Sequence, residues 1–149
     1  MPNWCENTLK LVGSKSDIEK FHEENTIVLE KHGVKKAVLS FEKSVPANGK
    51  IDVEEVRKRN PDMKCLPDWY LEQREAWGCK WDVGADDCTI SNDFSRYSFA
   101  TPWSPPYAWL RTIGMLYPTL KFTLDYDEPA MDYIGTMSVE GMSFEDTFV

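Results

Sequence analysis

The segment 120–126 constrains the fold of this chain more than any other stretch. Its apolar and polar residues alternate strictly, in the order Leu120, Lys121, Phe122, Thr123, Leu124, Asp125 and Tyr126. Successive side chains of a β-strand point to opposite faces of the sheet, so this pattern predicts a strand with one buried face and one polar face. Other parts of the chain must then supply the elements that cover the buried face.

A helix is predicted directly before this strand. Ser104 can cap its first turn, and Pro105 loses nothing at the first helical position because an N–H there has no partner in the helix. Apolar residues recur at helical spacing through Trp109, Leu110, Ile113, Leu116 and Tyr117. The proline at position 118 ends the pattern, so an amphipathic helix is expected to pack on the strand that follows.

The first strand and the first helix are predicted near the start of the chain. Thr8–Val12 alternates polar and apolar residues and ends in a turn. Ser16 and Glu19 then have the spacing of a capping box, in which both side chains bond to backbone N–H groups at the start of a helix. Apolar residues continue at helical spacing as far as Leu29, and Gly33 can close this helix in the left-handed conformation.

Residues 34–76 are less regular, and we expect them to form an insertion packed over one side of the fold. They contain a candidate short strand at 37–41, a short charged helix at 52–57 and a helix that begins at position 68 and ends at Trp77. No change of composition marks a domain boundary, so residues 1–149 are predicted to form a single domain.

The remaining elements complete the order of the fold. Residues 88–90 and 97–101 are predicted to pair as a hairpin, and 133–139 is expected to be a further strand, after which the acidic tail from Glu140 is expected to fray. Strand, helix, two strands, helix, strand is the order of a ferredoxin-like split βαβ arrangement. The sequence therefore predicts an α+β fold: an antiparallel sheet with two main helices on one face, an irregular insertion and an extra C-terminal strand.

The charge of the chain argues against direct binding to nucleic acid. Asp and Glu number 25 against 17 Lys and Arg, which gives a net charge of −8, whereas the nucleic-acid backbone is bound by lysine and arginine. The acidity is concentrated in residues 121–149, which hold seven acidic residues and one basic residue. Such a segment can be an ordinary solvated face, or it can imitate nucleic acid toward a basic partner.

Composition also bears on location and cofactors. No apolar run approaches the about 20 residues that a membrane span needs, and Met1–Trp4 lacks the features of a signal peptide. We expect a cytoplasmic protein with no membrane partner. The four cysteines are scattered without the spacing of metal ligands, so we expect reduced thiols, no metal and no other cofactor; they are Cys5, Cys65, Cys79 and Cys88.

Two tryptophan-rich motifs are the strongest candidates for a functional surface. They are Trp77-Gly78-Cys79-Lys80-Trp81-Asp82 and Thr101-Pro102-Trp103-Ser104-Pro105-Pro106. Tryptophan is enriched at binding hot spots, and the candidate binding residues are Trp77, Lys80, Trp81, Asp82 and Trp103. The alternative is that these rings fill the space between the sheet, the second helix and the insertion, as large aromatic side chains usually do.

No catalytic motif stands out in the sequence. Lys80 would favour the reactive thiolate form of Cys79, but the two histidines, His22 and His32, both lie far from it along the chain. We therefore assign no catalytic residue and expect a protein that is not an enzyme. The alternative is a small enzyme that acts on a nucleotide or a nucleic acid through Lys80 and Asp82.

Five segments occur in order over most of the chain: Met1–Leu9, Phe41–Pro46, Trp77–Asp82, Thr101–Pro106 and Tyr117–Leu120. Together they resemble the YubB-like family, small proteins of plasmids, phages and genomic islands. Cys79 stands where the family pattern has threonine. The resemblance implies a ferredoxin-like domain and a setting on mobile genetic elements, and it implies no established reaction, ligand or catalytic residue.

The functional expectation follows from that setting. A protein carried by phages and plasmids is expected to act in counter-defence or host takeover by binding a host protein or a small ligand. A second copy of this chain is a further candidate partner, in a homo-oligomer.

Overall fold

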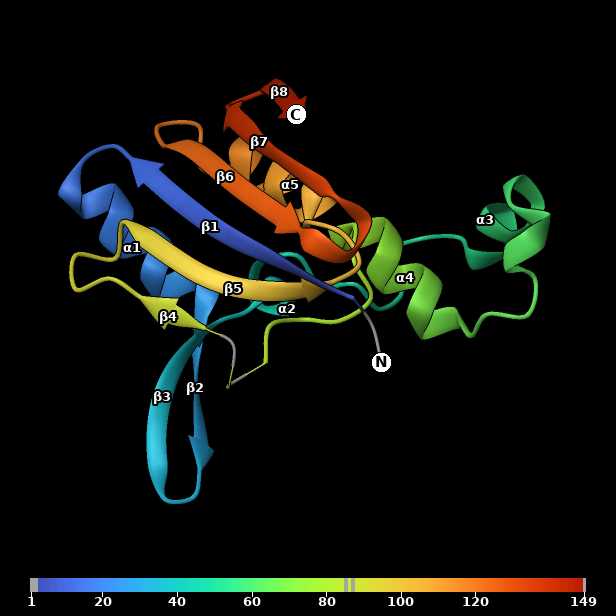
Figure 1. Ribbon diagram of the computed structural model, residues 1–149, viewed down its shortest axis with the longest axis horizontal. Coiled ribbons are helices and arrows are strands. Elements are labelled where there is room, and N and C mark those ends of the chain that lie inside the picture. Colours follow the sequence, from blue (N-terminus) through green and yellow to red (C-terminus); the bar gives the residue numbers. More distant parts are fainter. Residues whose placement is uncertain (1–2, 85, 87, 149) are drawn as a thin grey trace.

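Six antiparallel strands form the main sheet of the protein, in the order β4-β5-β1-β6-β7-β8 (Figure 1). The computed structural model describes residues 3–84, 86 and 88–148. Met1 and Pro2, which begin the first of the five segments that resemble the YubB-like family, lie outside the described residues. The strands of this sheet are β1 (Trp4–Val12), β4 (Thr89–Ile90), β5 (Arg96–Pro102), β6 (Lys121–Glu128), β7 (Tyr133–Glu140) and β8 (Ser143–Phe148).

The helices α1 (Lys15–Asn25) and α5 (Tyr107–Leu116) both cover one face of this sheet (Figure 1). Among the first four strands of this sheet and the two helices, the order along the chain is β1, α1, β4, β5, α5, β6. In space, β1 lies between β5 and β6. This is the ferredoxin-like arrangement, and it confirms the predicted fold class. The open face of the sheet carries the polar residues of the alternating strands.

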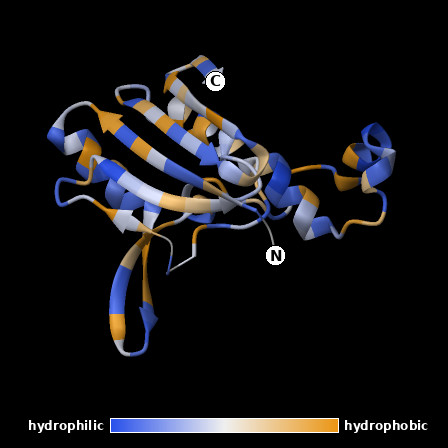
Figure 2. Ribbon diagram, in the orientation of Figure 1, coloured by the Kyte–Doolittle hydropathy of each residue, from blue (hydrophilic) through white to orange (hydrophobic). Residues whose placement is uncertain are grey.

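The core lies between the sheet and the two helices. Alternate residues of β6 are buried, as the pattern at 120–126 predicts, and Leu9 of β1 lies opposite Leu124 in the register. Figure 2 shows this alternation of hydrophobic and hydrophilic residues along the strands. From the helices, Phe21 contacts Trp109 and Phe122 with ring centroids 6.5 and 5.3 Å apart. One hydrophobic face of the sheet is thus closed by both helices.

The first helix is shorter than predicted. It begins after Ser14, whose side chain accepts a hydrogen bond from the Asp17 N–H, and it ends at Asn25. Residues 26–31 are not helical but form strand β2 (Thr26–Lys31), which pairs with β3 (Val34–Leu39) in a separate two-stranded sheet. The predicted helix as far as Gly33 is therefore wrong in its second half.

The turn of this hairpin explains the difference. His32 and Gly33 have φ angles of 52° and 78°, so both central residues of the two-residue loop are left-handed, as a tight hairpin turn requires. The run Thr26-Ile27-Val28 is β-branched, which favours a strand over a helix. The apolar spacing that resembled a helical stripe belongs partly to this strand, and Gly33 serves the turn rather than a helix end.

The segment before the second half of the sheet holds four short elements. They are α2 (Phe41–Ser44), α3 (Val53–Arg59), the 3₁₀ turn η1 (Pro61–Met63) and α4 (Asp68–Trp77). In Figure 1, α3 and η1 lie far from the sheet, and α4 leads back to it. The helix predicted at 52–57 is confirmed, with Asp52 accepting hydrogen bonds from two backbone N–H groups of its first turn. A single domain over 1–149 with an insertion at 34–76 stays a prediction.

The C-terminal end of the chain is more ordered than predicted. Two strands follow β6, not one: β7 pairs with β6, and β8 pairs with β7 across a turn at Gly141. The Tyr126 hydroxyl donates a hydrogen bond of 2.8 Å to Asp146, which ties β8 to β6. The expected fraying from Glu140 is wrong because the acidic residues of the tail alternate with residues that suit a strand.

Candidate functional site

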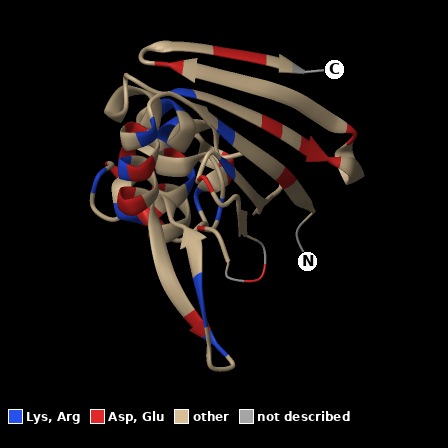
Figure 3. Cartoon of the chain, turned by 90° about the vertical axis from the view of Figure 1, so that its left-hand side faces the viewer, with Lys and Arg blue, Asp and Glu red and all other residues tan. Residues whose placement is uncertain are grey.

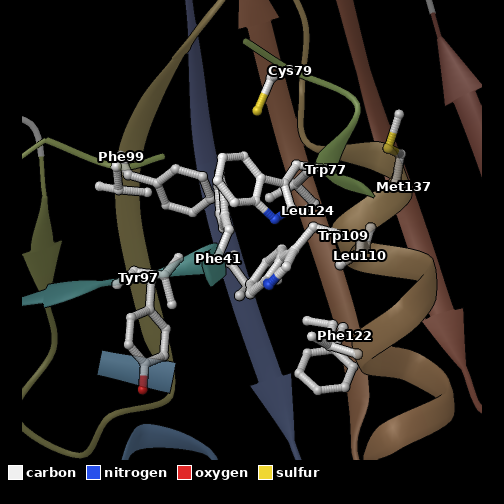
Figure 4. Close-up of a cluster of buried hydrophobic side chains, with 14 of the residues drawn as sticks. Phe41, Trp77, Cys79, Tyr97, Phe99, Trp109, Leu110, Phe122, Leu124 and Met137 are labelled. Carbon is white, nitrogen blue, oxygen red and sulfur yellow. The ribbon is translucent and has the colours of Figure 1, made fainter. Parts of the chain in front are cut away.

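Trp77 belongs to the core and not to the surface. Its side chain is only 2% exposed, and its ring packs against Phe41 and is bonded through Nε1 to the Val45 carbonyl at 2.8 Å. Figure 4 shows Trp77 among Phe41, Phe99, Leu124 and Trp109. The assignment of Trp77 to a binding surface is therefore wrong; helix α4 directs this residue toward the sheet.

Gly78 separates this buried ring from the residues that follow. It ends α4 in the left-handed conformation with φ of 85°, and a Cβ at this position would lie 2.7 Å from the Tyr107 ring. The Ser104 hydroxyl donates to the Gly78 carbonyl at 2.8 Å, so Ser104 does not cap α5, which starts at Tyr107, two residues later than predicted. The two tryptophan motifs are thus joined by a hydrogen bond from a side chain of the second to the backbone of the first.

The carboxylate of Asp82 caps helix α2 from a distant part of the chain. Oδ1 accepts the Phe41 N–H at 2.7 Å, and Oδ2 accepts the Glu42 N–H at 3.1 Å. Asp82 also accepts the Ser40 hydroxyl and the Val83 N–H, so both of its oxygens have partners. The assignment of Asp82 to a binding surface is corrected by these bonds: its charge is used to hold the start of α2.

Lys80 lies among four aromatic rings. Its ammonium nitrogen is 4.6 Å from the ring centroid of Trp81 and 5.5 Å from that of Trp103. Two rings of α4 complete the set, Tyr70 at 5.5 Å and Trp69 at 6.0 Å. A cation within about 6 Å of a ring centroid is attracted to the π face. The structure therefore brings together Lys80, Trp81 and Trp103 of the predicted residues.

A fifth ring extends this group, and its four tryptophans are half-exposed. Trp4 lies beside Trp81, with ring centroids 6.3 Å apart and the rings tilted by 41°. The exposed fractions of the four tryptophan side chains lie between 38% and 45%. We call this group the aromatic surface; it consists of Trp4, Trp69, Tyr70, Trp81 and Trp103 around Lys80. Sequence reasoning missed Trp4, Trp69 and Tyr70. The only signal for Trp69 and Tyr70 was their position about two helical turns before Trp77 on the same helix.

Trp103 is held in an unusual backbone conformation. Its φ angle is 63°, in the left-handed region that bulky side chains rarely adopt, and its N–H donates to the Asn3 carbonyl at 2.7 Å. Such a conformation costs on the order of 1–3 kcal/mol. The residue is still 45% exposed, so burial of the ring offsets only part of that cost.

The buried thiols lack the chemistry of a nucleophile. Cys79 is almost fully buried, and burial raises the pKa of its thiol well above the ordinary value, with a further contribution from the Asp82 charge. Burial likewise raises the pKa of Cys5 to about 12. Lys80 does not counter this effect, since its ammonium lies among the rings. Cys79 is therefore a core residue that remains a neutral thiol.

The acidic residues of 121–149 do not share one face. Glu128 is fully buried, and Asp146 bonds to buried Tyr126 on the helix side of the sheet. Asp125 lies on the open face, where it pairs with Lys10 at 3.1 Å. Figure 3 shows basic residues interleaved with acidic ones along the strands. This distribution gives little support to an acidic imitation of nucleic acid.

The described residues offer neither a cluster of metal ligands nor a helix that could span a membrane. Within residues 3–84, 86 and 88–148, no group of three or more His, Cys, Asp and Glu side chains is placed to hold a metal ion. None of the helices in that part of the chain is both long enough and apolar enough to cross a membrane.

Comparison with known proteins agrees with the fold. Residues 76–148 match the family model of the ferredoxin-like domain in Api92-like protein. The crystal structure of the protein api92 from Yersinia pseudotuberculosis is similar with a TM-score of 0.58 at 10% sequence identity, over 99% of this chain and 98% of that chain. A comparison with curated proteins found no match. The resemblance to the YubB-like family stays a prediction, and what the comparisons establish is a ferredoxin-like fold whose C-terminal half is similar to the corresponding domain of Api92-like proteins.

Proposed function

We propose that this protein is a binding module that docks a protein partner with a basic surface on the aromatic surface around Lys80. The observation that carries the proposal is the clustering of four half-exposed tryptophans from separate parts of the chain. Contiguous exposed apolar patches mark interaction sites, and tryptophan is the residue most enriched at binding hot spots.

The conformation of Trp103 supports a functional reason for this surface. Glycine would occupy the same φ angle without strain, yet the position carries the largest side chain, and that residue is only half-buried. Strained residues persist where the surrounding structure holds them, and they cluster at binding sites. A ring kept at such a cost is better explained by contact with a partner than by the stability of the free protein.

The shape of the surface favours a protein over a small ligand. Each tryptophan of the aromatic surface keeps more than a third of its area in water, so the rings form an open face and not an enclosed pocket. Small-molecule sites bury most of their ligand in a concave pocket, whereas protein interfaces are flatter and are anchored by a few large side chains.

The surrounding charge favours a basic partner. Glu6 follows Trp4 by two residues on the open face of the sheet, and it lies opposite Asp127 in the strand register. Both carboxylates are exposed, and the chain as a whole carries a net charge of −8. Complementary charge accelerates association and selects between partners. Arginine on the partner also suits exposed indole rings, on which its guanidinium stacks.

The alternative enzyme that uses Lys80 and Asp82 has less support. The two oxygens of Asp82 accept four hydrogen bonds, three of them at the start of α2, while the ammonium of Lys80 lies among the rings. The mobile-element setting, the role in counter-defence and the capacity for self-association stay predictions.

Trp103→Gly is the variant that tests the proposed surface. Glycine relieves the left-handed strain while removing the ring, so the variant should fold as well as the wild type. Wild type, Trp103→Gly and the control Met142→Ala, which alters the 90% exposed Met142 elsewhere, are used to capture proteins from a host lysate. A partner that the wild type and the control retain and Trp103→Gly loses is then purified for titration calorimetry.

The titration decides the proposal. We expect the Kd of that partner to rise at least tenfold for Trp103→Gly and to stay within twofold for Met142→Ala. Raising the salt concentration should weaken binding, because the partner is basic. Retention of the same proteins by all three forms, or equal affinities in the titration, would show that the aromatic surface is not the docking site.

A further inference from the structure

A concave site lies away from the aromatic surface, where α1 and the hairpin strand β3 meet β4 and the loop before β5. Its volume is about 420 Å³, which is within the usual range for small-molecule pockets. The lining residues on which the inference rests are His22, Lys36, Thr89, Ile90, Asn92 and Phe94. We propose that this cavity binds a small anionic ligand with a flat ring, of the class of nucleoside monophosphates.

A fixed pair of rings forms one wall of the cavity. The imidazole of His22 and the ring of Phe94 are stacked at a centroid distance of 3.8 Å and an angle of 7°. His22 is further held by a hydrogen bond of 2.9 Å between Nδ1 and the Tyr97 hydroxyl. Both rings are therefore positioned before any ligand arrives, and a flat ring can extend the stack beside the apolar side chain of Ile90.

Phe94 has the same type of strained backbone as Trp103. Its φ angle is 63°, and its side chain is only partly buried. Glycine or asparagine would fit this position in the loop with less strain. The phenylalanine is thus retained at a cost, and the stack with His22 on the cavity wall is the contact that this conformation secures.

The polar groups around the cavity are suited to an anion. Lys36 lines it, and Figure 3 shows blue lysine segments on the same hairpin. No carboxylate is found among the described residues that line the cavity. Lys31, which pairs with the nearby Asp86 at 2.5 Å, and then Lys36 lower the pKa of that carboxyl, while Asp93 accepts hydrogen bonds from Ser91 and Ser95.

Two hydrogen-bonding side chains remain for a ligand. In the part of the chain that the structure describes, the side chains of Thr89 and Asn92 make no hydrogen bond, and both are exposed at the cavity. A hydroxyl and an amide can bind a phosphate or the polar edge of a base. Cation, hydrogen-bonding groups and stacked rings together match the parts of a nucleotide, although the protein as a whole is acidic.

The test uses calorimetry and NMR with defined probes. The four ribonucleoside monophosphates are titrated into the full-length protein, with adenosine and inorganic phosphate as partial ligands. We expect at least one mononucleotide to bind with a submillimolar Kd, at least tenfold tighter than either partial ligand. Amide shifts should map to β4 and the loop at Phe94, and not to the residues around Lys80.

Three variants separate the parts of the site. Phe94→Gly removes the ring and relieves the strain, and Lys36→Gln removes the charge from an exposed position; each is expected to weaken binding at least tenfold. Lys35→Gln is the matched control, since the neighbouring residue of β3 points to the opposite side of the strand, and its Kd should stay within twofold.

Several results would overturn the inference. Absence of binding by all four nucleotides would do so, as would equal affinity for inorganic phosphate and the nucleotide, or an unchanged Kd in Phe94→Gly and Lys36→Gln. Because none of these residues belongs to the aromatic surface, the outcome is independent of the test with Trp103→Gly.

Discussion

Three residues of one motif have three different roles in this protein. Trp77 fills the core, Lys80 lies among exposed rings, and Asp82 bonds to the backbone of α2. The residue types at these positions are all common at binding sites, so composition alone does not distinguish them. The direction of each side chain distinguishes their roles. That direction depends on Gly78, which turns the chain between Trp77 and the two residues that follow, Lys80 and Asp82.

Asp82 offers the clearest test at this scale. Replacing it with alanine leaves the N–H groups of Phe41 and Glu42 without their acceptor, and loss of a helix cap with charged hydrogen bonds costs about 2 kcal/mol. We expect the free energy of unfolding, measured by urea denaturation, to fall by about that amount in Asp82→Ala.

The matched control for this variant is Asp62→Ala, which removes an exposed carboxylate at η1. It should change the free energy of unfolding by less than about 0.5 kcal/mol. If both variants were equally stable, the capping role of Asp82 would be wrong and its carboxylate would be available for binding.

His22 gives the fold a dependence on pH. Burial disfavours the charged imidazolium and Lys43 adds repulsion, so the pKa of His22 lies below its ordinary value of 6.5. The folded state therefore binds a proton less readily than the unfolded state. This contribution to stability is fully present above pH 6.5 and decreases as the pH falls below that value.

The measurement combines two observables. An NMR titration should place the pKa of His22 below 6.5, and urea denaturation between pH 5 and 8 should show a loss of stability on the acid side that is smaller in His22→Gln. Asp93, next to Phe94 that stacks on His22, titrates below this window, because hydrogen bonds from Ser95 and Ser91 lower the pKa of its carboxyl to about 2. An unchanged pH slope in His22→Gln would assign the loss to another group.

At the scale of elements, the sequence predicted the strands and helices that have one buried face, because burial of one face produces a regular spacing of apolar residues. The strand at 120–126, the helix that ends before Pro118 and the hairpin of β4 and β5 lie where periodicity places them. The hairpin of β2 and β3 was missed because both of its strands are largely exposed, so alternation there is weak and helical spacing arises by chance over a few residues.

The candidate site was predictable only in part, for a similar reason. Trp81, Trp103 and Lys80 stand out by residue type, but their contact with Trp69 and Tyr70 depends on how α4 is placed against the loop that follows it. The bond from Asp82 to α2 spans some 40 residues. Local rules of capping do not reach that far, and Ser40, the residue directly before α2, makes no side-chain cap bond to it.

The β2–β3 turn provides a prediction for one element. His32 has a left-handed backbone that asparagine tolerates better and that valine strongly disfavours. We expect His32→Asn to raise the free energy of unfolding by about 0.5 kcal/mol and His32→Val to lower it by about 1 kcal/mol. Thermal and urea denaturation of the wild type, His32→Asn and His32→Val checks the order of their free energies of unfolding. A valine variant as stable as the wild type would mean that the turn is not of this type.

At the scale of the whole molecule, the cysteines report which parts are closed to solvent. Cys65 is exposed, whereas Cys5, Cys79 and Cys88 are buried and burial raises the pKa of each of these three thiols. Thiolate is the reactive form. We expect a maleimide reagent at pH 7 to label Cys65 rapidly in the native protein and all four thiols after denaturation.

Mass spectrometry of the labelled chain gives the count and the position of the modified residues. Rapid native labelling of Cys79 would contradict its place in the core and would return it to consideration as a nucleophile. Slow labelling of the three buried thiols at the rate of global unfolding would indicate that the sheet and the two helices open as one cooperative unit.

The division of the six tryptophans between interior and surface has a practical consequence. Trp77 and Trp109 are buried, while Trp4, Trp69, Trp81 and Trp103 lie in water on one side of the molecule. Their intrinsic fluorescence therefore contains a blue-shifted component from the interior and a red-shifted component that a dissolved quencher can reach. Unfolding changes the first and occupation of the surface changes the second, so the native chain carries separate optical signals for its stability and for its partner.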